Sequence, residues 1–426
     1  MHQLKFGMFV RELDCPWLDT PFKYQGFYVQ SVEDVLTLKE FCSHVYIDLD
    51  KSRHLSNDKL NIKHDNKHEK QIIEHREQFW VPDSHLLKDV EYPDKVSVED
   101  ELMPAMEARS NAVAVVEALY ADIRSGSSID TSDTKKAVTS LVDSVIRNPD
   151  AHALLALLEE CDEQRLVHSL NVCTLSLALG RMFGFPRQYM IELGLGAILH
   201  DVGQTRIPLE LVKREGVLTD EEYEVMKHHT TLGMELLLDE ERHLPYRAID
   251  TVFTHHERYD GHGYPERIRG ELIPLYGRIV AIADFYEAIT SAQATKEQLT
   301  PGAAMTELYA LRNINFDANL VEEFIKCVGI FPIGCTVLLN SGEVGIVIAQ
   351  NRESRLEPKL MLIIDKEDNF YPVPRFFDIA LFKDKEEESL RVTSIVAPDE
   401  YGVNVKHYIG DMVLMQEASE KVRDAT

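Results

Sequence analysis

The sequence predicts a multidomain protein: a mainly α-helical central domain, flanked by a small N-terminal α/β domain and a small β-rich module near the C-terminus. Histidine and aspartate residues recur through the central region at gaps of roughly 30 residues, which suits side chains carried on successive helices. Apolar residues at helical spacing precede that region, and short β-rich runs follow it. The length of 426 residues is consistent with about three domains.

The first 55 residues contain short apolar stretches and one helix-like segment. Residues 27–29 and 44–48 are typical of strands. Between them, residues 31–42 have helical character, with Ser31 as the N-cap residue and Asp34 three positions later. This mixture predicts a small α/β domain over residues 1–55.

Residues 56–100 differ in composition from the segments on either side. They are rich in Lys, His, Asp and Glu and contain the breaker Pro82-Asp83. This composition predicts a charged linker that is flexible in part. Its histidines are irregularly spaced, which favours a polar linker over metal buffering. The histidines in and just before this segment are His54, His64, His68, His75 and His85.

Residues 101–147 show helical periodicity in two stretches, 101–125 and 133–147. The apolar positions that define the two faces are Ala112, Val115, Val116 and Leu119, then Val138, Leu141, Val142 and Val145. We expect a helical connector that packs against the central domain or a partner subunit.

The pattern changes after residue 325, where short β-rich runs occupy residues 336–339, 345–348 and 360–364. Asn340-Ser341-Gly342 between the first two runs is typical of a hairpin turn. These features predict a β-rich module over residues 326–388, followed by a charged C-terminal tail over residues 389–426. Structural support is the expected role of this module.

Composition restricts the classes of partner. The formal net charge of −27 disfavours binding to a nucleic acid polymer, whose phosphates would be repelled. The chain has no apolar run of 18 residues and no signal-peptide core, so we expect a cytoplasmic protein without a membrane partner. Its six cysteines form no Cys-x-x-Cys pair, which favours reduced thiols.

The spaced histidines and aspartates predict a metal site. The set comprises His168, His200, Asp201, His229, His255, His256 and Asp284. Imidazole and carboxylate ligands suit Fe, Mn, Zn or Ni, and the absence of thiolates from the set favours an open catalytic site over a structural zinc site. Adjacent helical residues point about 100° apart, so His200 and Asp201 are best accommodated if Asp201 bridges two metals.

Four segments of the chain together resemble the HD-GYP family, a branch of the HD phosphohydrolases. They are His200-Asp201-Val202-Gly203, Met226-Lys227-His228-His229, the run from His255 to Pro265, and Ile282-Ala283-Asp284. The resemblance implies an HD-type helical catalytic domain over residues 148–325. Residues 6–10 and 18–22 are also similar to a domain of unknown function that is often joined to HD-GYP domains.

The resemblance implies a phosphodiesterase that opens a cyclic dinucleotide to a linear product. His168, His200, Asp201 and Asp284 would hold one divalent metal, and Asp201, His229, His255 and His256 the other. Fe or Mn is the first choice, with Ni, Zn or Co as alternatives. A hydroxide bridging the metals would attack phosphorus in line with the departing ribose oxygen, with His200 and Asp201 as the central catalytic residues. Gln164, where some members carry a Glu that recruits a third metal, favours two.

The same resemblance marks six residues as candidate substrate contacts: Gln204, Gly263, Tyr264, Pro265, Gln293 and Lys296. Gly261 and Gly263 would let the backbone approach the ligand closely, and Tyr264 either stacks on a purine or anchors the turn. The chain departs from the family at Gln204, where Lys is usual, and at Gln293, in a segment where Arg is usual. Lys296 is the remaining cationic candidate.

The other nearby polar residues need no special role. His152, His228, His243 and His262 are expected to be ordinary core or solvated histidines. His229 is preferred to its neighbour His228 because it lies four residues before Gly233, as in the family. For Asp260, turn chemistry at Asp-Gly is a sufficient explanation.

Three functions remain open from the sequence. The first is hydrolysis of cyclic di-GMP, with cyclic GMP-AMP as an alternative substrate. The second is a catalytically weak or inactive receptor or scaffold that binds the dinucleotide, with a homodimer or a signalling protein as partner. The third, hydrolysis of mononucleotides, is disfavoured by the Gly-Tyr-Pro segment.

Overall fold

The computed structural model describes residues 9–14, 27–28, 38, 42, 45–48, 90–127, 131–158, 164–214, 216–238, 244–291, 298–382 and 390–424. The chain divides into two compact units, residues 1–77 and residues 78–426.

The first unit contains a three-stranded antiparallel sheet in the order β2-β1-β3. Its strands are β1 (Phe9–Leu13), β2 (Phe27–Tyr28) and β3 (Val45–Asp48). Val10 pairs with Phe27 on one side and with Ile47 on the other, and its side chain is fully buried. Strands β2 and β3 coincide with the predicted runs at 27–29 and 44–48, whereas β1 was not predicted as a strand. Most of the expected helix at 31–42 lies outside the described residues.

The second unit begins with two helices, α3 (Val98–Ser125) and α4 (Ser132–Arg147). Ser97 caps α3 by accepting a hydrogen bond from the backbone of Asp100, and Gly126 ends the helix with φ 73°. The two helices confirm the predicted periodicity. The boundary differs slightly, because α3 starts inside the segment expected to be linker.

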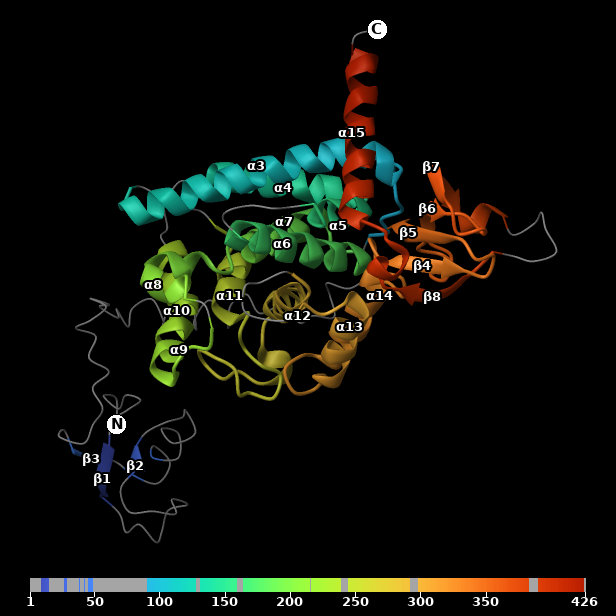
Figure 1. The fold of residues 1–426 in the computed structure, drawn as a ribbon. Coiled ribbons are helices and arrows are strands. Elements are labelled where there is room, and N and C mark those ends of the chain that lie inside the picture. The colour runs from blue at the N-terminus through green and yellow to red at the C-terminus, as the bar shows by residue number, and fades with distance from the viewer. Residues whose placement is uncertain are drawn as a thin grey trace. The chain divides into compact units, whose positions relative to one another are not determined.

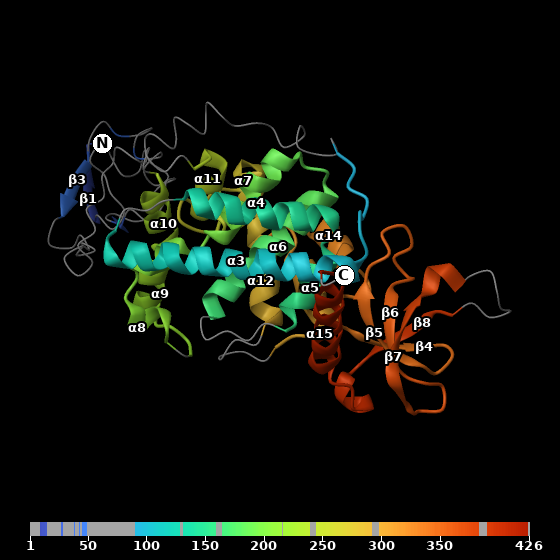
Figure 2. The same cartoon turned by 90° about the horizontal axis from the view of Figure 1, so that it is seen from above.

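Helices α3 and α4 lie side by side across the helical core (Figures 1 and 2). In that core α6 packs against α7 and α12, and α11 packs against α7, α10 and α12. The elements are α5 (Asp150–Ala156), α6 (Gln164–Met182), α7 (Arg187–Ile198), the 3₁₀ helix η4 (Val202–Arg206), α8 (Leu209–Val212), α9 (Asp220–Lys227), α10 (His229–Leu237), α11 (Tyr246–Thr254), η6 (Gly270–Leu272), α12 (Leu275–Thr290), α13 (Pro301–Ala310) and α14 (Ala318–Val328). The central region is mainly α-helical, as predicted.

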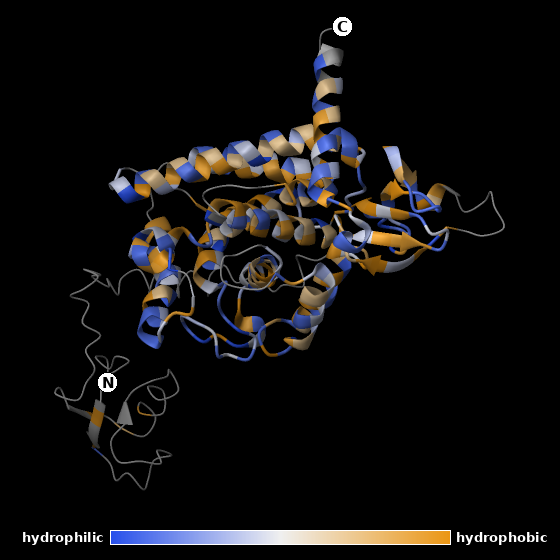
Figure 3. Ribbon diagram, viewed as in Figure 1, coloured by the Kyte–Doolittle hydropathy of each residue, from blue (hydrophilic) through white to orange (hydrophobic). Residues whose placement is uncertain are grey.

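A five-stranded antiparallel sheet follows, in the order β7-β6-β5-β4-β8. Its strands are β4 (Thr336–Leu339), β5 (Val344–Ala349), β6 (Lys359–Ile364), β7 (Phe370–Asp378) and β8 (Val392–Val396). The predicted runs correspond to β4, β5 and β6, and the predicted turn connects β4 to β5 with Gly342 at φ 92°. Figure 3 shows predominantly hydrophobic strands here, and β5 and β6 are almost entirely buried.

The prediction of a tail over residues 389–426 is wrong. Strand β8 pairs with β4, so the sheet extends beyond residue 388. After the 3₁₀ helix η8 (Pro398–Tyr401), α15 (Val405–Asp424) packs against α3. The reason is a narrow apolar face: Ile409, Met412 and Val413, at helical spacing, are buried, whereas Leu414 and Met415 of the same helix are exposed.

The β-rich module shares its core with the helices. One buried apolar cluster combines Leu102 of α3, Leu154 of α5, Ile346 of β5 and Ile409 of α15. Polar contacts add to it, since the backbone N–H of Gln350 donates to Asp150 Oδ2 at 2.7 Å. The predicted connector, catalytic domain and β-rich module therefore form one compact unit. None of the described helices has the length and apolar composition needed to cross a bilayer.

Candidate metal centre

The seven predicted histidines and aspartates come from five places in the helical core, mostly at helix ends. His168 lies within α6 and Asp284 within α12. His200 and Asp201 form the turn between α7 and η4. His229 is the first residue of α10, and His255 and His256 directly follow α11. The seven side chains are thus carried on successive helices, as predicted, and five of them lie at helix ends.

The structure brings these side chains into two groups, each with its ligand atoms within 4.8 Å of one another. The His168 group consists of His168, His200 and Asp284, and the His229 group consists of Asp201, His229, His255 and His256. In the His168 group, His168 Nε2 lies 3.0 Å from Asp284 Oδ1. In the His229 group, the Nε2 atoms of His229 and His255 are 3.3 Å apart.

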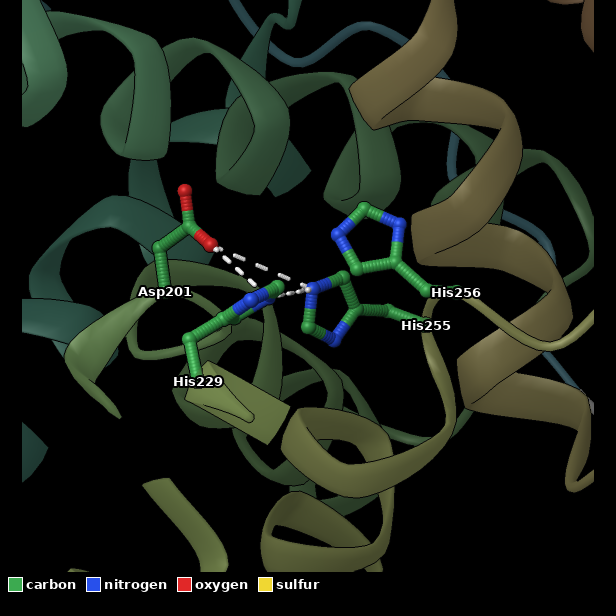
Figure 4. A group of neighbouring side chains, drawn as sticks. All are labelled: Asp201, His229, His255 and His256. Carbon is green, nitrogen blue, oxygen red and sulfur yellow. Dashed lines mark hydrogen bonds and ion pairs between the residues drawn. The ribbon is translucent and has the colours of Figure 1, made fainter. Parts of the chain in front are cut away.

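Asp201 lies between the two groups. Its Oδ1 atom is 3.3 Å from His229 Nε2 and 4.0 Å from His255 Nε2, and its Oδ2 atom is 3.5 Å from His200 Nε2. Figure 4 shows the carboxylate facing the histidine rings, with its contacts to His229 and His255 as dashed lines. Each oxygen therefore faces a different group, which is the arrangement that a bridging carboxylate requires.

Backbone carbonyls fix the orientation of three of these imidazoles. The Nδ1 atoms of His200, His229 and His255 each lie 2.8 Å from the carbonyl oxygen three residues earlier in the chain. A ring that donates from Nδ1 to a carbonyl has its lone pair on Nε2, the atom that faces the other side chains here. The local fold thus selects the tautomer that a metal ligand needs.

His168 is oriented by a side chain that the sequence analysis missed. Its Nδ1 atom contacts Glu287 Oε2, and burial is outweighed by Asp284 and Glu287, so the pKa of His168 is raised well above its ordinary value. Glu287 contacts Asn171 in turn, at 3.4 Å, and Asn171 Oδ1 accepts a hydrogen bond from Arg109 at 2.6 Å. Glu287 lies three residues after Asp284, on the same face of α12, and this spacing could have identified it.

The charges in the centre are strongly coupled. Burial by itself would raise the pKa of Asp201, but His200 and His229 hold it well below its usual range. Burial and neighbouring histidines lower the pKa values of His255 and His256 well below 6.5. Asp201 is therefore ionised and His255 and His256 are neutral, the protonation states that metal ligation requires, whereas Asp284 and Glu287 favour the protonated form of His168.

These residues fit divalent cations. The Nε2 atom of His200 is buried and has no hydrogen-bond partner among the described residues, although it faces Asp201 at 3.5 Å and Asp284 at 4.0 Å. A buried polar atom without a partner is costly, and a cation at this point would satisfy it. Gly203 allows the approach of η4 to α10, since a Cβ there would lie 1.9 Å from the carbonyl oxygen of His229.

The Gly263-Tyr264-Pro265 segment lies beside the His229 group. Gly263 is buried against the chain itself, since a Cβ there would lie 2.2 Å from the backbone nitrogen of Arg258. Its lack of a side chain serves this packing, and its contact with a ligand stays a prediction. The Tyr264 ring centroid lies 4.8 Å from that of His256, and a cis peptide bond joins Tyr264 to Pro265.

The remaining predicted contacts are distributed unevenly. Gln204 in η4 lines a cleft together with His168 and Asp201. Gln293 and Lys296 lie outside the described residues. His228 and Asp260 belong to neither metal group, and Asp260 accepts hydrogen bonds from Arg258 and from the backbone of His262 in a turn.

The other histidines set aside in the sequence analysis are partly described. His152 is a buried core residue whose Nε2 atom lies 2.9 Å from Ser144 Oγ, and His262 is exposed. His243 lies outside the described residues. Neither described histidine belongs to a metal group.

Comparisons with known proteins agree with this geometry. A family model described as "HD domain" matches residues 153–320, and one described as "Domain of unknown function (DUF3391)" matches residues 1–134. "Cyclic di-GMP phosphodiesterase PA4108" of Pseudomonas aeruginosa is 33% identical over 379 residues, covering 88% of this chain and 86% of that protein. The chain is thus an HD-domain protein.

Other relatives match shorter parts of the chain. "Cyclic di-GMP phosphodiesterase response regulator RpfG" of Xanthomonas campestris is 38% identical over 148 residues, which is 35% of this chain and 39% of that protein. "3'3'-cGAMP-specific phosphodiesterase 2" of Vibrio cholerae is 34% identical over 159 residues, which is 37% of this chain and 30% of that protein. Within the HD-domain proteins, the chain belongs to the HD-GYP family and carries a DUF3391 domain at its N-terminus.

Proposed function

We propose that this protein is a metal-dependent phosphodiesterase that hydrolyses a cyclic dinucleotide to a linear dinucleotide. The observation that carries the proposal is the position of Asp201, whose two carboxylate oxygens face separate groups of histidines at 3.3 to 3.5 Å. The relative from Pseudomonas aeruginosa, which matches most of both chains, bears the name of a cyclic di-GMP phosphodiesterase.

In this proposal the His168 group and Asp201 hold one divalent metal, while the His229 group holds the other through the same Asp201. Iron or manganese is the first choice, with nickel, zinc or cobalt as alternatives, because mixed imidazole and carboxylate sets accept all of them. Two divalent cations at such a site lower the pKa of a water molecule and neutralise charge on a phosphoryl group.

The side chains around the centre have their own tasks. His200, His229 and His255 keep their Nδ1 protons on backbone carbonyls, which keeps their Nε2 atoms free for ligation. Asp201 spans the two groups, and together with His200 it forms the centre of the catalytic machinery.

One wall beside the centre is aromatic and suits a purine. Tyr264 packs over His256, and the Tyr223 ring lies 6.4 Å from the Tyr264 ring, measured between centroids. Lys227 Nζ lies 4.6 Å from the Tyr223 centroid. Aromatic rings flanked by a cation are well suited to stack on a nucleobase. We assign Tyr264, in the Gly263-Tyr264-Pro265 turn, to the purine of the substrate.

Cyclic di-GMP is the substrate that we propose, and cyclic GMP-AMP is the alternative, in line with the names of the relatives. The test is to incubate iron- or manganese-loaded protein with each dinucleotide separately and to follow linear products by chromatography. Product that disappears in the double variant His200→Ala, Asp201→Ala would support the proposal. The variant Asp260→Asn is the matched control, because Asp260 is a nearby carboxylate outside both metal groups.

A second candidate is a receptor or scaffold that binds the dinucleotide without turnover. The uncharged Gln204 beside the metal groups favours this alternative, because it offers no cationic contact to a phosphate. Equilibrium dialysis decides between the two functions. Stable binding of cyclic di-GMP by metal-loaded protein with no linear product after prolonged incubation would establish the receptor and exclude the enzyme.

A further inference from the structure

A cleft beside the metal groups is lined by cationic side chains. Arg124, Arg165 and Lys213 line it together with Asp201 and other residues of the centre. Carboxylates such as Asp94, Asp150 and Glu353 line other parts of the same cleft, so its charge is mixed along its length. Positive charge near a metal centre marks a surface that accepts an anion.

Helix geometry places two of these cations near the centre. Arg165 lies on α6, three residues before His168, so the two side chains share one face of that helix. Arg124 lies in the last turn of α3, a helix that packs against both α6 and η4. The 3₁₀ helix η4 begins directly after Asp201 and contains Gln204. The end of α3 is thereby held beside the turn that carries Asp201.

The buried Tyr120, four residues before Arg124 on α3, indicates the same proximity. Burial raises the pKa of its hydroxyl, the charge of Asp201 raises it further, and Arg165 and Arg124 oppose the rise. One side chain is thus within electrostatic reach of the central aspartate and of both arginines.

The two arginines have no carboxylate within ion-pair distance among the residues that the structure describes. Other arginines of the cleft differ in this respect. Arg214 pairs with Glu222, and Arg181 pairs with Asp94 at 2.7 Å. A guanidinium that keeps its full donor set matches a phosphate, to which it can give two parallel hydrogen bonds.

We infer that Arg124 and Arg165 form a second phosphate site, which binds the phosphodiester of the cyclic dinucleotide that is not being cleaved. The inference rests on the proposed function and names the residues that select its substrate. A cyclic dinucleotide has two phosphodiesters. With one phosphoryl group at the metals, the other needs separate neutralisation, which the uncharged Gln204 does not give. A diester with a single phosphate would not use this site.

The test compares Arg124→Gln, Arg165→Gln and Arg165→Lys with the wild-type protein. Arg391→Gln is the matched control, because it removes the same charge from an exposed residue of the β-rich module. The first measurement is the affinity of metal-loaded protein for cyclic di-GMP, obtained from the KM of its hydrolysis, and the second is hydrolysis of bis(p-nitrophenyl) phosphate, which has a single phosphodiester, by the same metal-loaded protein. Circular dichroism and thermal unfolding verify that each variant folds.

We expect each Arg→Gln variant to weaken cyclic di-GMP binding by about 10- to 100-fold. Arg165→Lys should recover part of the affinity because it keeps the charge but loses the paired donors. Hydrolysis of the single diester should stay within about twofold of wild type. Folded Arg→Gln variants that bind cyclic di-GMP as tightly as wild type would overturn the second phosphate site alone. A wild-type protein that neither binds nor cleaves cyclic dinucleotides would overturn the proposed function, and the inference with it.

Discussion

The two halves of the metal centre differ in the support of one ligand, His168, although a backbone carbonyl orients at least one histidine in each half. His168 depends on a chain of side chains, Glu287, Asn171 and Arg109, that crosses three helices. His229 and His255 are held by backbone carbonyls within their own helical turns. Orientation by the backbone is tolerant of substitution, whereas orientation by a side-chain relay can be broken at each of its members. Single substitutions in this relay should therefore weaken metal binding by the His168 group and leave metal binding by the His229 group unchanged.

The largest effect should come from Asp201→Asn, because Asp201 is the residue that faces both groups. The amide keeps one carbonyl oxygen and loses the charge. We expect metal content to fall from about two ions per chain to below one and turnover to fall by about 1000-fold or more. Elemental analysis and product chromatography measure both. Asp260→Asn should leave both unchanged, and retention of two ions by Asp201→Asn would contradict the bridging role.

The substitution Glu287→Gln should lower the metal affinity of the His168 group but not that of the His229 group. Loss of the charged acceptor leaves the His168 ring less fixed and less basic, and substitutions behind a metal ligand typically cost about 10- to 100-fold in affinity or activity. Metal titration should show one weakened site and one site of wild-type affinity. Glu271→Gln, on the exposed η6, is the control. Equal weakening of both sites would show that the halves do not differ as we describe.

Low pH should decrease the free energy of unfolding through His152, which adjoins the side-chain relay because its backbone carbonyl accepts a hydrogen bond from Arg109. Burial, then Arg109 and Arg147, lower the pKa of His152 well below its ordinary value of 6.5. The unfolded chain therefore binds the proton more readily than the folded one. The contribution of His152 to stability is complete above about pH 6.5 and declines as the pH falls below it, by at most about 1.4 kcal/mol per pH unit.

Urea unfolding of metal-free protein at pH 7.5 and pH 5.5 measures this decline. The variant His152→Gln should lose less stability than wild type between the two values, because its side chain does not titrate. Equal losses in the two proteins would assign the acid sensitivity to other groups.

The smallest effect should come from Asn171→Ala. Asn171 accepts a short hydrogen bond from Arg109, at 2.6 Å, but its contact with Glu287 is longer, at 3.4 Å, and therefore weaker. We expect a loss of about 1 kcal/mol in the free energy of unfolding and a smaller loss of turnover than in Glu287→Gln. Thermal unfolding and kinetics of the two variants provide the comparison. A larger kinetic loss in Asn171→Ala would place the main support of His168 at Asn171 instead.

The sequence was sufficient to predict which seven side chains converge, because their spacing follows the ends of consecutive helices. It did not reveal how they are supported. Glu287 was missed because a lone glutamate on a helix is ordinarily solvated, and its role depends on the facing His168. The packing of Gly263 against the backbone of Arg258 was also missed, because a glycine required by packing and one required by a ligand look identical in a sequence.

In the C-terminal region the sequence analysis missed a whole packed helix. Its charged composition indicated a tail, although Ile409, Met412 and Val413 already had helical spacing. Exposed apolar residues such as Leu414 and Met415 lie beside these positions, so the buried face of the helix cannot be identified until a complementary surface is known. That surface is provided by α3, more than 280 positions earlier in the chain, and such pairing is not readable from local periodicity.

The 28-residue helix α3 is about 42 Å long at 1.5 Å per residue, and it contacts α15 as well as η4. It lies wholly within the N-terminal family match and supplies Arg109 to the relay behind His168. A protein cut down to residues 148–325 would lose α3 and α4 and would expose the surface of α7 that Val138 now covers. The HD segment therefore does not form a complete folding unit by itself. A fusion protein built from it would need to include α3 and α4.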